Sequence, residues 1–182
     1  TLSSSSAASD VYKRQLLRLQ ARRIEDPGAS AALNEAVRRI ASIALVHETL
    51  SSSRDSSVAF DEVLDSLVSH ALELSPRMNE LRIERTGKLG SLEPRIATPL
   101  ALVITELIHN ALEHGLAEEG LALGIHVSSN GSELSVTISD DGVGFPEGFD
   151  ISTSPNLGLQ IVRTLTENEL RGTLSLITDE QE

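Results

Sequence analysis

The 182-residue sequence contains no cysteine and no tryptophan, and aromatic residues make up only 2% of it. The absence of cysteine excludes disulfides and thiolate metal sites. With so few aromatic side chains, the core must be built from leucine, isoleucine, valine and alanine, and an apolar share of 40% is enough for one. Basic residues are scarce as well, because 15 Lys and Arg stand against 27 Asp and Glu, a formal net charge of −12. Such an acidic surface repels nucleic acid and anionic lipid, so neither is an expected partner.

Long apolar runs and targeting signals are also missing. No run approaches the roughly 20 apolar residues that span a bilayer, and the start of the chain has no signal-peptide pattern. We therefore expect a cytoplasmic chain without a membrane segment, although a longer parent protein could carry sensor or membrane segments. Residues 1–10 are rich in serine and alanine, which predicts a disordered leader whose native origin is left open.

Two helical patterns occupy residues 11–52. A broad apolar band extends as far as Glu25, where Asp26-Pro27-Gly28 interrupts it. From Leu33 to Leu50 apolar residues recur at spacings of three and four, as on one face of a helix. An antiparallel hairpin of two such helices cannot bury its apolar stripe alone, so we expect dimerisation into a four-helix bundle.

Helix and strand patterns alternate over residues 58–182, after a serine-rich linker. Helices are predicted over Phe60–Ser75, from Thr98 to His114 and over about Gly158–Thr166. Strands are predicted over Leu81–Glu84, Gly124–Ser129, Glu133–Ser139 and near Thr173–Ile177, with a loop or weak strand over Lys88–Glu93. Asn130-Gly131 is a strong hairpin signal. These patterns predict an α+β domain with helices on one face of a mixed sheet.

The helix that ends at Gly115 carries the first chemically suggestive segment. Glu106 and Asn110 are four residues apart, so both project from one helix face, and His114 lies one turn further on. A carboxylate and a carboxamide on one face suit Mg²⁺ with its phosphates. An ordinary amphipathic helix has the same pattern, and for this segment alone it is the favoured interpretation.

Two glycine-containing segments follow. Asp140, Gly142 and Gly144 form a D-x-G-x-G loop, in which backbone can approach a ligand closely. An aspartate at a strand end can also accept a hydrogen bond from an exocyclic amine. In Leu157-Gly158-Leu159 the glycine opens a helix, whose free N–H groups form an anion site suited to phosphate. Each segment alone is equally consistent with an ordinary turn or loop-to-helix junction.

The order of the three segments is more informative than any one of them. E-x-x-x-N, a hairpin, D-x-G-x-G and then L-G-L before a helix resemble the N, G1 and G2 boxes of the GHKL ATPases, the superfamily of histidine kinases, gyrase and Hsp90. Four stretches, residues 16–23, 36–50, 97–115 and 156–165, further resemble cytosolic histidine kinases with a HisKA_2-type dimerisation domain. The resemblance covers the chain from about Leu16 to Thr178.

This resemblance implies an activity and its partners. Residues 58–182 would form a Bergerat-type α/β sandwich that binds ATP and Mg²⁺. Residues 11–52 would be a partial dimerisation and phosphoacceptor domain that forms a homodimer. The γ-phosphoryl group of ATP would pass to a histidine and then to a response regulator.

The resemblance also implies roles for individual residues. Asn110 would ligate Mg²⁺, and Glu106 would orient or deprotonate the attacking group. Asp140 would bind the adenine amino group, while the other expected contacts surround the nucleotide. Those contacts are the backbone at Gly142 and Gly144, the segment Leu157, Gly158 and Leu159 over the phosphates, and His114 against the base or sugar.

The family's phosphoacceptor has no counterpart at the expected place. It lies in a first-helix stretch resembling H-x-x-x-N-N-L-Q, whereas residues 3–15 contain no histidine. We therefore expect that this chain does not phosphorylate itself. The histidines present are expected to be structural or solvated, apart from His114, and they are His47, His70, His109 and His126.

Two further positions depart from the family pattern. Asn156 stands where many of these kinases have glycine, and left-handed backbone, which asparagine tolerates, would accommodate it. The family usually adds another strand beyond Glu182, so we expect a truncated domain with an exposed sheet edge.

Two other functions are kept open. A serine kinase of the anti-sigma type uses the same ATPase fold, although the two leading helices argue against it. A non-enzymatic, nucleotide-binding dimerisation module is the other alternative. The intact Glu106 and Asn110 argue against a dead site without excluding one.

Overall fold

The computed structural model of the chain describes residues 57–73, 75, 77, 79–116, 120–154 and 156–178. The chain divides into two compact units, residues 1–51 and 52–182, and the described residues all belong to the second. The predicted leader over 1–10 and the predicted hairpin over 11–52, with His47, lie outside the described residues.

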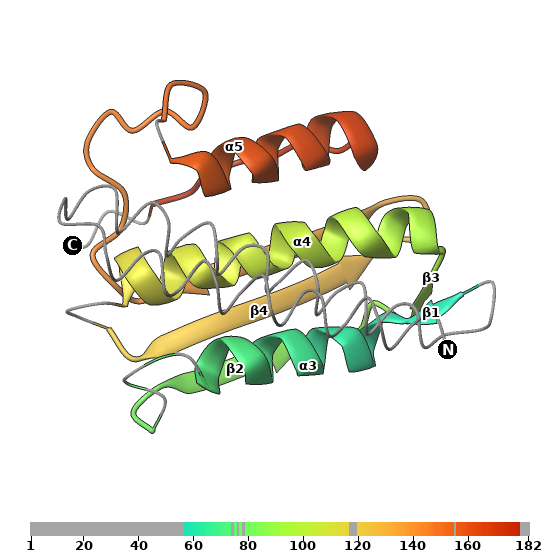
Figure 1. Cartoon of the computed structure of the whole chain (residues 1–182), viewed down its shortest axis with the longest axis horizontal. Helices are drawn as coiled ribbons and strands as arrows, with labels where there is room; N and C mark the ends of the chain where they lie inside the picture. The colour runs from blue at the N-terminus through green and yellow to red at the C-terminus, as the bar shows by residue number, and fades with distance from the viewer. Residues whose placement is uncertain are drawn as a thin grey trace, which may run out of the picture. The chain divides into compact units, whose positions relative to one another are not determined.

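Three helices form one layer of this unit. They are α3 (Phe60–Glu73), α4 (Pro94–Asn110) and α5 (Leu157–Thr164). Two of them continue as a turn of the wider π-helix, η1 (Ala111–Gly115) after α4 and η2 (Leu165–Glu169) after α5. Figure 1 shows α4 between α3 and α5, and both neighbours contact it.

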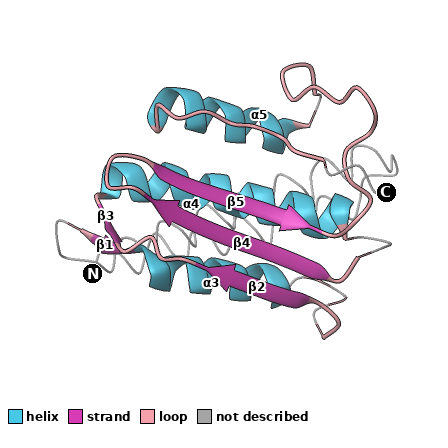
Figure 2. Cartoon of the chain, turned by 180° about the vertical axis from the view of Figure 1, so that it is seen from behind, coloured by secondary structure: helices cyan, strands magenta, loops and turns pink. Residues whose placement is uncertain are grey.

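A mixed sheet forms the second layer. Strand β2 (Arg82–Thr86) pairs in parallel with β4 (Ala122–Ser129), which pairs antiparallel with β5 (Leu134–Asp140). Two short strands, β1 (Val58–Ala59) and β3 (Ser91–Leu92), form a separate antiparallel pair. In Figure 2 the three-stranded sheet lies on one side of the helices, as the sequence predicts.

Alternating side chains explain this layering. Leu123, Ile125 and Val127 of β4 are buried, whereas His126 and Ser128 between and beyond them are exposed. A strand directs alternate side chains to opposite faces, so the buried set faces the helices. Helix α3 meets them with apolar residues spaced by three and four, namely Phe60, Val63, Leu64, Leu67 and Ala71.

Helix α4 is the centre of the core. Ala97, Ala101, Ile104 and Ile108 are fully inaccessible to solvent. By length and composition, Pro94–Gly115 is apolar enough to cross a bilayer, a property that the sequence analysis did not expect. More than half of that window is buried inside the domain, so core packing accounts for its apolar character.

The start of α4 differs from the prediction. The helix begins at Pro94 with Glu93 as its N-cap, whereas the sequence predicts Thr98 as the cap and Pro99 in the first turn; Pro99 lies inside the helix. Proline is favoured in the first turn because it lacks an N–H that a helix start leaves unpaired. By that rule either proline could begin the helix; the structure begins it at Pro94, which leaves Pro99 in the second turn.

The strand predicted near Thr173–Ile177 is absent from the described residues. Residues 171–178 are irregular, and Ile177 is 79% exposed. After η2, Arg171 takes a positive φ of 53° and the Gly172 amide donates to the Thr166 carbonyl at 2.8 Å. A strand needs a ladder partner, and none of the described pairings includes this segment.

Candidate functional site

The predicted polar face of α4 runs from the core to the surface. Glu106 is buried at 7% exposure, Asn110 is half-buried and His114 is exposed. Asn110 is the last α-helical residue, and the Leu116 amide donates to the Ala111 carbonyl (2.7 Å) to close the π turn. Single π turns within helices frequently occur at functional sites. His109 is also buried, at 9% exposure.

The side-chain nitrogen Nδ2 of Asn110 is buried and has no hydrogen-bond partner among the described residues. A buried polar atom without a partner costs about 1–3 kcal/mol, so native structures rarely tolerate one without a reason. A half-turn of the carboxamide exchanges its nitrogen and oxygen. The buried end can therefore donate to a phosphate oxygen or, after the half-turn, ligate a cation.

The end of η1 meets the D-x-G-x-G loop directly. The Val143 amide donates to the Gly115 carbonyl at 3.2 Å. A Cβ atom on Gly142 would overlap that same carbonyl, so glycine is required there by a close approach of backbone to backbone. Gly144, two residues on, has a positive φ of 67°. The structure thus brings the Asn110 helix and the glycine loop together.

Asp140 ends β5 at this junction. Its Oδ1 accepts a hydrogen bond from the Gly142 amide at 3.1 Å. A Cβ on Gly115 would collide with the Asp140 carboxylate, so this carboxylate lies against the end of η1. Asp140 is otherwise exposed, and one carboxylate oxygen is left out of that internal hydrogen bond.

Asp141 is a residue that the sequence analysis missed. Its Oδ1 accepts from the backbone amides of Leu121 and Ala122, both at 2.7 Å. The hydrogen bond from Ala122 is the main cause that holds the pKa of Asp141 below its usual value, and Arg82 adds to it. Both amides are about twenty residues away in sequence, so no local pattern could have indicated these contacts.

The start of α5 is built differently from the prediction. Asn156 is extended (φ −67°, ψ 113°), not left-handed, and it is the N-cap. Its Oδ1 accepts from the amides of Gly158 at 2.8 Å and Leu159 at 3.3 Å. These are two of the N–H groups expected to be free for phosphate, so the structure shows them capped by a side chain.

The L-G-L segment divides between surface and core. Leu157 is 56% exposed, whereas Gly158 and Leu159 are buried where α5 packs on α4. Leu157, Val143 and Phe145 are among the few large apolar side chains of the described residues that are exposed. The ring of Phe145 stacks on that of Phe149 with centroids 4.9 Å apart.

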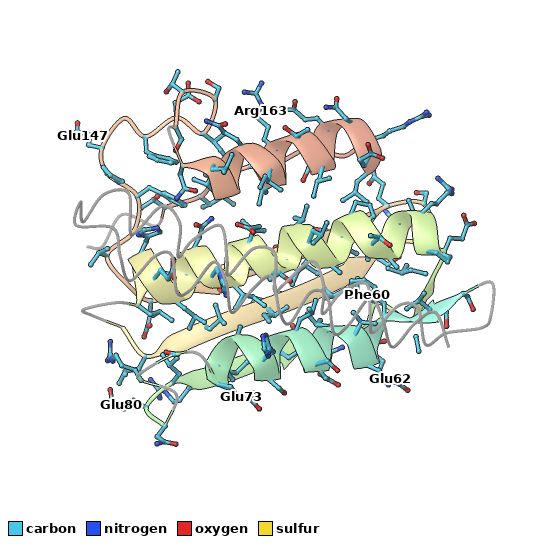
Figure 3. All side chains as sticks on the ribbon, viewed as in Figure 1. Phe60, Glu62, Glu73, Glu80, Glu147 and Arg163 are labelled. Atoms are coloured by element: carbon cyan, nitrogen blue, oxygen red, sulfur yellow. The ribbon has the colours of Figure 1, made fainter. Side chains whose placement is uncertain are left out.

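A groove of about 280 Å³ lies elsewhere on α5 and includes none of the predicted site residues. Its lining is polar, and Figure 3 shows Arg163, one of its residues, pointing away from α4. The residues that line it are Ile151, Ser152, Gln160, Arg163, Thr164, Glu167 and Asn168. Another described histidine, His126, lies on the sheet, where it shares a 2.8 Å hydrogen bond with the Thr86 hydroxyl.

Sequence comparison finds two matching families. Residues 14–75 match HisKA_2, described as histidine kinase. Residues 95–182 match HATPase_c, described as the histidine kinase-, DNA gyrase B-, and HSP90-like ATPase.

Curated relatives agree with these matches. The sensor histidine kinase PdtaS of Mycobacterium tuberculosis is 46% identical over 164 residues, 88% of this chain. The protein of the same name in Mycolicibacterium smegmatis is 45% identical over the same share. The chain spans only 32% and 33% of the lengths of these two relatives.

A solved structure agrees in fold. The histidine kinase domain of the Erythrobacter litoralis EL346 blue-light-activated histidine kinase superposes with a TM-score of 0.64. The match covers 88% of this chain and 84% of that one at 18% identity, so it is evidence for the fold alone.

Proposed function

We propose, from the premise that this chain belongs to the sensor histidine kinases of the GHKL ATPase superfamily, that it is the ATP-binding catalytic part of a two-component kinase. The observation that carries the proposal is the junction between η1 and the glycine loop. There the Gly115 carbonyl meets Gly142 and Val143, one turn beyond a buried Asn110 nitrogen that has no partner among the described residues. The donor set suits a nucleotide with its cation.

Each residue of this junction has a proposed task. Asn110 holds Mg²⁺ or a phosphate oxygen with the buried end of its carboxamide. Asp140 accepts a hydrogen bond from the adenine amino group, and His114 at the exposed end of η1 borders the base or sugar. When bound, Mg²⁺ neutralises charge on the phosphates. The buried Glu106 orients or deprotonates the attacking group from the same helix face.

Phosphate at α5 has to compete with Asn156. The amides of Gly158 and Leu159 donate to the Asn156 side chain in this structure. A phosphate that accepted hydrogen bonds from these amides would displace the Asn156 carboxamide oxygen. The exchange replaces a neutral acceptor with a charged one, and a charged acceptor forms stronger hydrogen bonds. Leu157 and Leu159 with the backbone at Gly158 would then close over the phosphates.

The comparisons favour this function over the two alternatives. The HisKA_2 match over residues 14–75 supports a histidine kinase over a serine kinase of the anti-sigma type. The buried Asn110 nitrogen, which has no partner in the part of the chain that the structure describes, supports a site that binds a ligand, because a site that binds nothing would gain stability by replacing it. We propose a homodimer and a response regulator as partners, by analogy with this family.

The deciding variant is Asn110→Ala. We expect Mg-ATP affinity to fall by roughly tenfold to a hundredfold, as for a lost hydrogen bond or ligand to a charged group. Stability should not fall, because the variant removes a buried donor without a partner among the described residues, a relief of about 1–3 kcal/mol that the lost packing of the smaller side chain offsets in part. Calorimetric titration with and without Mg²⁺ measures the first, and thermal unfolding measures the second.

A matched control is Asn130→Ala in the β4–β5 hairpin. Its Oδ1 accepts from the amides of Ser132 (3.1 Å) and Glu133 (2.9 Å), so it is a structurally employed asparagine. This control should lose stability and keep ATP affinity, the reverse of Asn110→Ala. Unchanged Mg-ATP binding in Asn110→Ala would refute the assignment of Asn110.

A further inference from the structure

We propose that Asp141 is a positioning residue that sets the preference of the site for adenine, by holding Asp140 in place. The inference rests on the proposed function, since it assumes that Asp140 contacts the base. It adds a residue whose side chain does not itself touch the nucleotide.

The anchor consists of side-chain and backbone contacts to the first residues of β4. One carboxylate oxygen of Asp141 accepts from the consecutive amides of Leu121 and Ala122, both at 2.7 Å. The Asp141 amide donates back to the Ala122 carbonyl at 3.3 Å. Gly120 lies directly against the same carboxylate, since a Cβ there would be 2.7 Å from Oδ1. These hydrogen bonds to an ionised acceptor are of the strong class.

The anchor lies between two residues of the site. The ladder of β4 and β5 ends at the pair Leu123 and Asp140, and Asp141 extends it by one rung through its side chain. Immediately before the anchor is Asp140, and immediately after it is Gly142, which is packed on the Gly115 carbonyl. The backbone on both sides of Asp140 is therefore fixed, by β5 on one side and by Asp141 on the other.

Removing the Asp141 carboxylate would leave this strand end with the backbone hydrogen bond from the Asp141 amide to the Ala122 carbonyl, but without the two side-chain hydrogen bonds from Leu121 and Ala122. The Asp140 carboxylate is held by the Gly142 amide, which is itself part of the glycine loop. Displacing the loop would move donor and acceptor together and would leave the direction of the carboxylate unfixed. A small misplacement of a binding group weakens an oriented hydrogen bond strongly, so adenine should lose its advantage while the phosphate contacts remain.

Asp61 also accepts hydrogen bonds from two consecutive backbone amides, but it has no proposed nucleotide-binding residue next to it in the sequence. Its two carboxylate oxygens accept from the consecutive amides of Leu89 (3.1 Å) and Gly90 (2.8 Å). Asp61 lies in the first turn of α3, beside β1 and β3, and it pairs with Arg85. Removing it should cost stability through the same kind of lost contacts, far from the glycine loop.

The experiment compares nucleotide selectivity across four forms of the 182-residue chain: unchanged, Asp141→Ala, Asp141→Asn and Asp61→Ala. Dissociation constants for Mg-ATP and Mg-GTP are measured by calorimetry, with the thermal midpoint recorded for each form. The unchanged chain should favour ATP by roughly tenfold to a hundredfold, because guanine would set a carbonyl against the Asp140 acceptor. Asp141→Ala should bring the two nucleotides to within about threefold of each other, mainly by weakening ATP.

Two other forms separate positioning from general stability. Asp141→Asn keeps an oxygen that can accept from Leu121 and Ala122, so it should retain most of the ATP preference. Asp61→Ala should lower the thermal midpoint and keep the full preference. If Asp141→Ala does not fold, Asp141→Ser takes its place, because its shorter side chain cannot bridge both amides.

The outcomes distinguish this inference from the proposed function. ATP binding with the full preference retained in Asp141→Ala overturns the inference alone. An equal loss of preference in Asp61→Ala also overturns it, because selectivity would then follow stability. Failure of the unchanged chain to bind ATP overturns the proposed function, and the inference falls with it.

Discussion

The two ends of helix α4 use similar devices and differ in what they leave unsatisfied. At its start, Asp61 accepts from the amides of Leu89 and Gly90 and pairs with Arg85. At its end, Asp141 accepts from Leu121 and Ala122, and Gly142 packs on Gly115. Figure 1 shows these ends on opposite sides of the unit, with β1 and β3 near the start.

The two ends of α4 differ in whether their polar side chains have hydrogen-bond partners among the described residues. Beside the start of α4, the half-buried carboxylate of Asp61 in α3 is paired with two amides and an arginine. At the end of α4 the buried Asn110 nitrogen has no partner among the described residues, and the helix switches to a π turn. A fold tolerates such a cost where something else completes the site. The comparison therefore predicts that changes at the start affect stability alone, and changes at the end affect binding as well.

The largest expected effect is that of Gly142→Ala at the end of α4. The added Cβ would overlap the Gly115 carbonyl, and both partners are backbone, so neither can rotate away. We expect a loss of about 3 kcal/mol in unfolding free energy, at the upper end for an overpacked site. ATP binding should be lost together with it, because the junction between η1 and the glycine loop would open. Chemical denaturation and nucleotide titration measure the two effects.

Gly90→Ala is the matched control at the other end. Gly90 has a positive φ of 67°, but a Cβ there would meet nothing within 4 Å. Its cost is therefore conformational and should be about 1 kcal/mol. ATP affinity should remain that of the unchanged chain. The comparison between the two ends fails if Gly90→Ala weakens ATP binding as much as Gly142→Ala does.

A smaller effect is expected from the charge of Asp61. Partial burial opposes ionisation of Asp61, but the Leu89 and Gly90 amides and Arg85 outweigh it and hold its pKa below the usual 3.8. A lowered folded-state pKa stabilises the fold above the unfolded value, and that stability is lost as pH falls through the folded pKa. Asp61→Asn should therefore cost about 1 kcal/mol near pH 7, a value reduced by solvent screening of a carboxylate that is 28% exposed.

The pH dependence checks that assignment. The stability difference between the unchanged chain and Asp61→Asn should be constant above about pH 5 and should shrink as pH falls below 3.8. Urea unfolding between pH 3 and pH 7 measures it. A difference that persists unchanged at about pH 3 would mean that the lost contacts, not the charge, account for the effect.

Periodic patterns made much of this fold predictable. The spacing of Phe60, Val63, Leu64 and Leu67 indicated α3, and the alternation in β4 and β5 with the Asn130-Gly131 turn indicated the hairpin. These signals are local, because the residues that produce them belong to one element. The three boxes were likewise found from residue type and order, which motif spacing preserves.

The features that the sequence did not reveal depend on contacts between residues far apart in the chain, or on a choice between two local patterns that are equally suitable. Two prolines, Pro94 and Pro99, both suit a first turn, so the start of α4 was placed five residues late. A strand near Thr173–Ile177 needs a neighbour, and the segment has none among the described pairings. The anchor at Asp141 joins residues about twenty positions apart, and the extended N-cap at Asn156 depends on the path of the preceding loop.

The smallest expected effect concerns Arg171, which follows η2. In Figure 1 the red end of the α5–η2 helix lies toward the start of α4, and η2 contacts α4. Arg171 has a φ of 53°, in the left-handed region where a side chain costs roughly 1 kcal/mol. Glycine is the usual residue at such a helix end, where the Gly172 amide reaches back to the Thr166 carbonyl.

Arg171→Gly should therefore stabilise the chain by about 0.5 kcal/mol, since relief of the strain is partly offset by the greater freedom of glycine in the unfolded chain. The thermal midpoint should rise by about 2 °C. Arg171→Ala is the control, because it removes the same side chain, keeps the Cβ and relieves nothing. ATP affinity should be unchanged in both, as befits a position beside the start of α4. If Arg171→Gly is no more stable than Arg171→Ala, the left-handed conformation carries no strain. If either variant weakens ATP binding, then the start of α4 does not affect stability alone, and the comparison between the two ends of α4 does not hold.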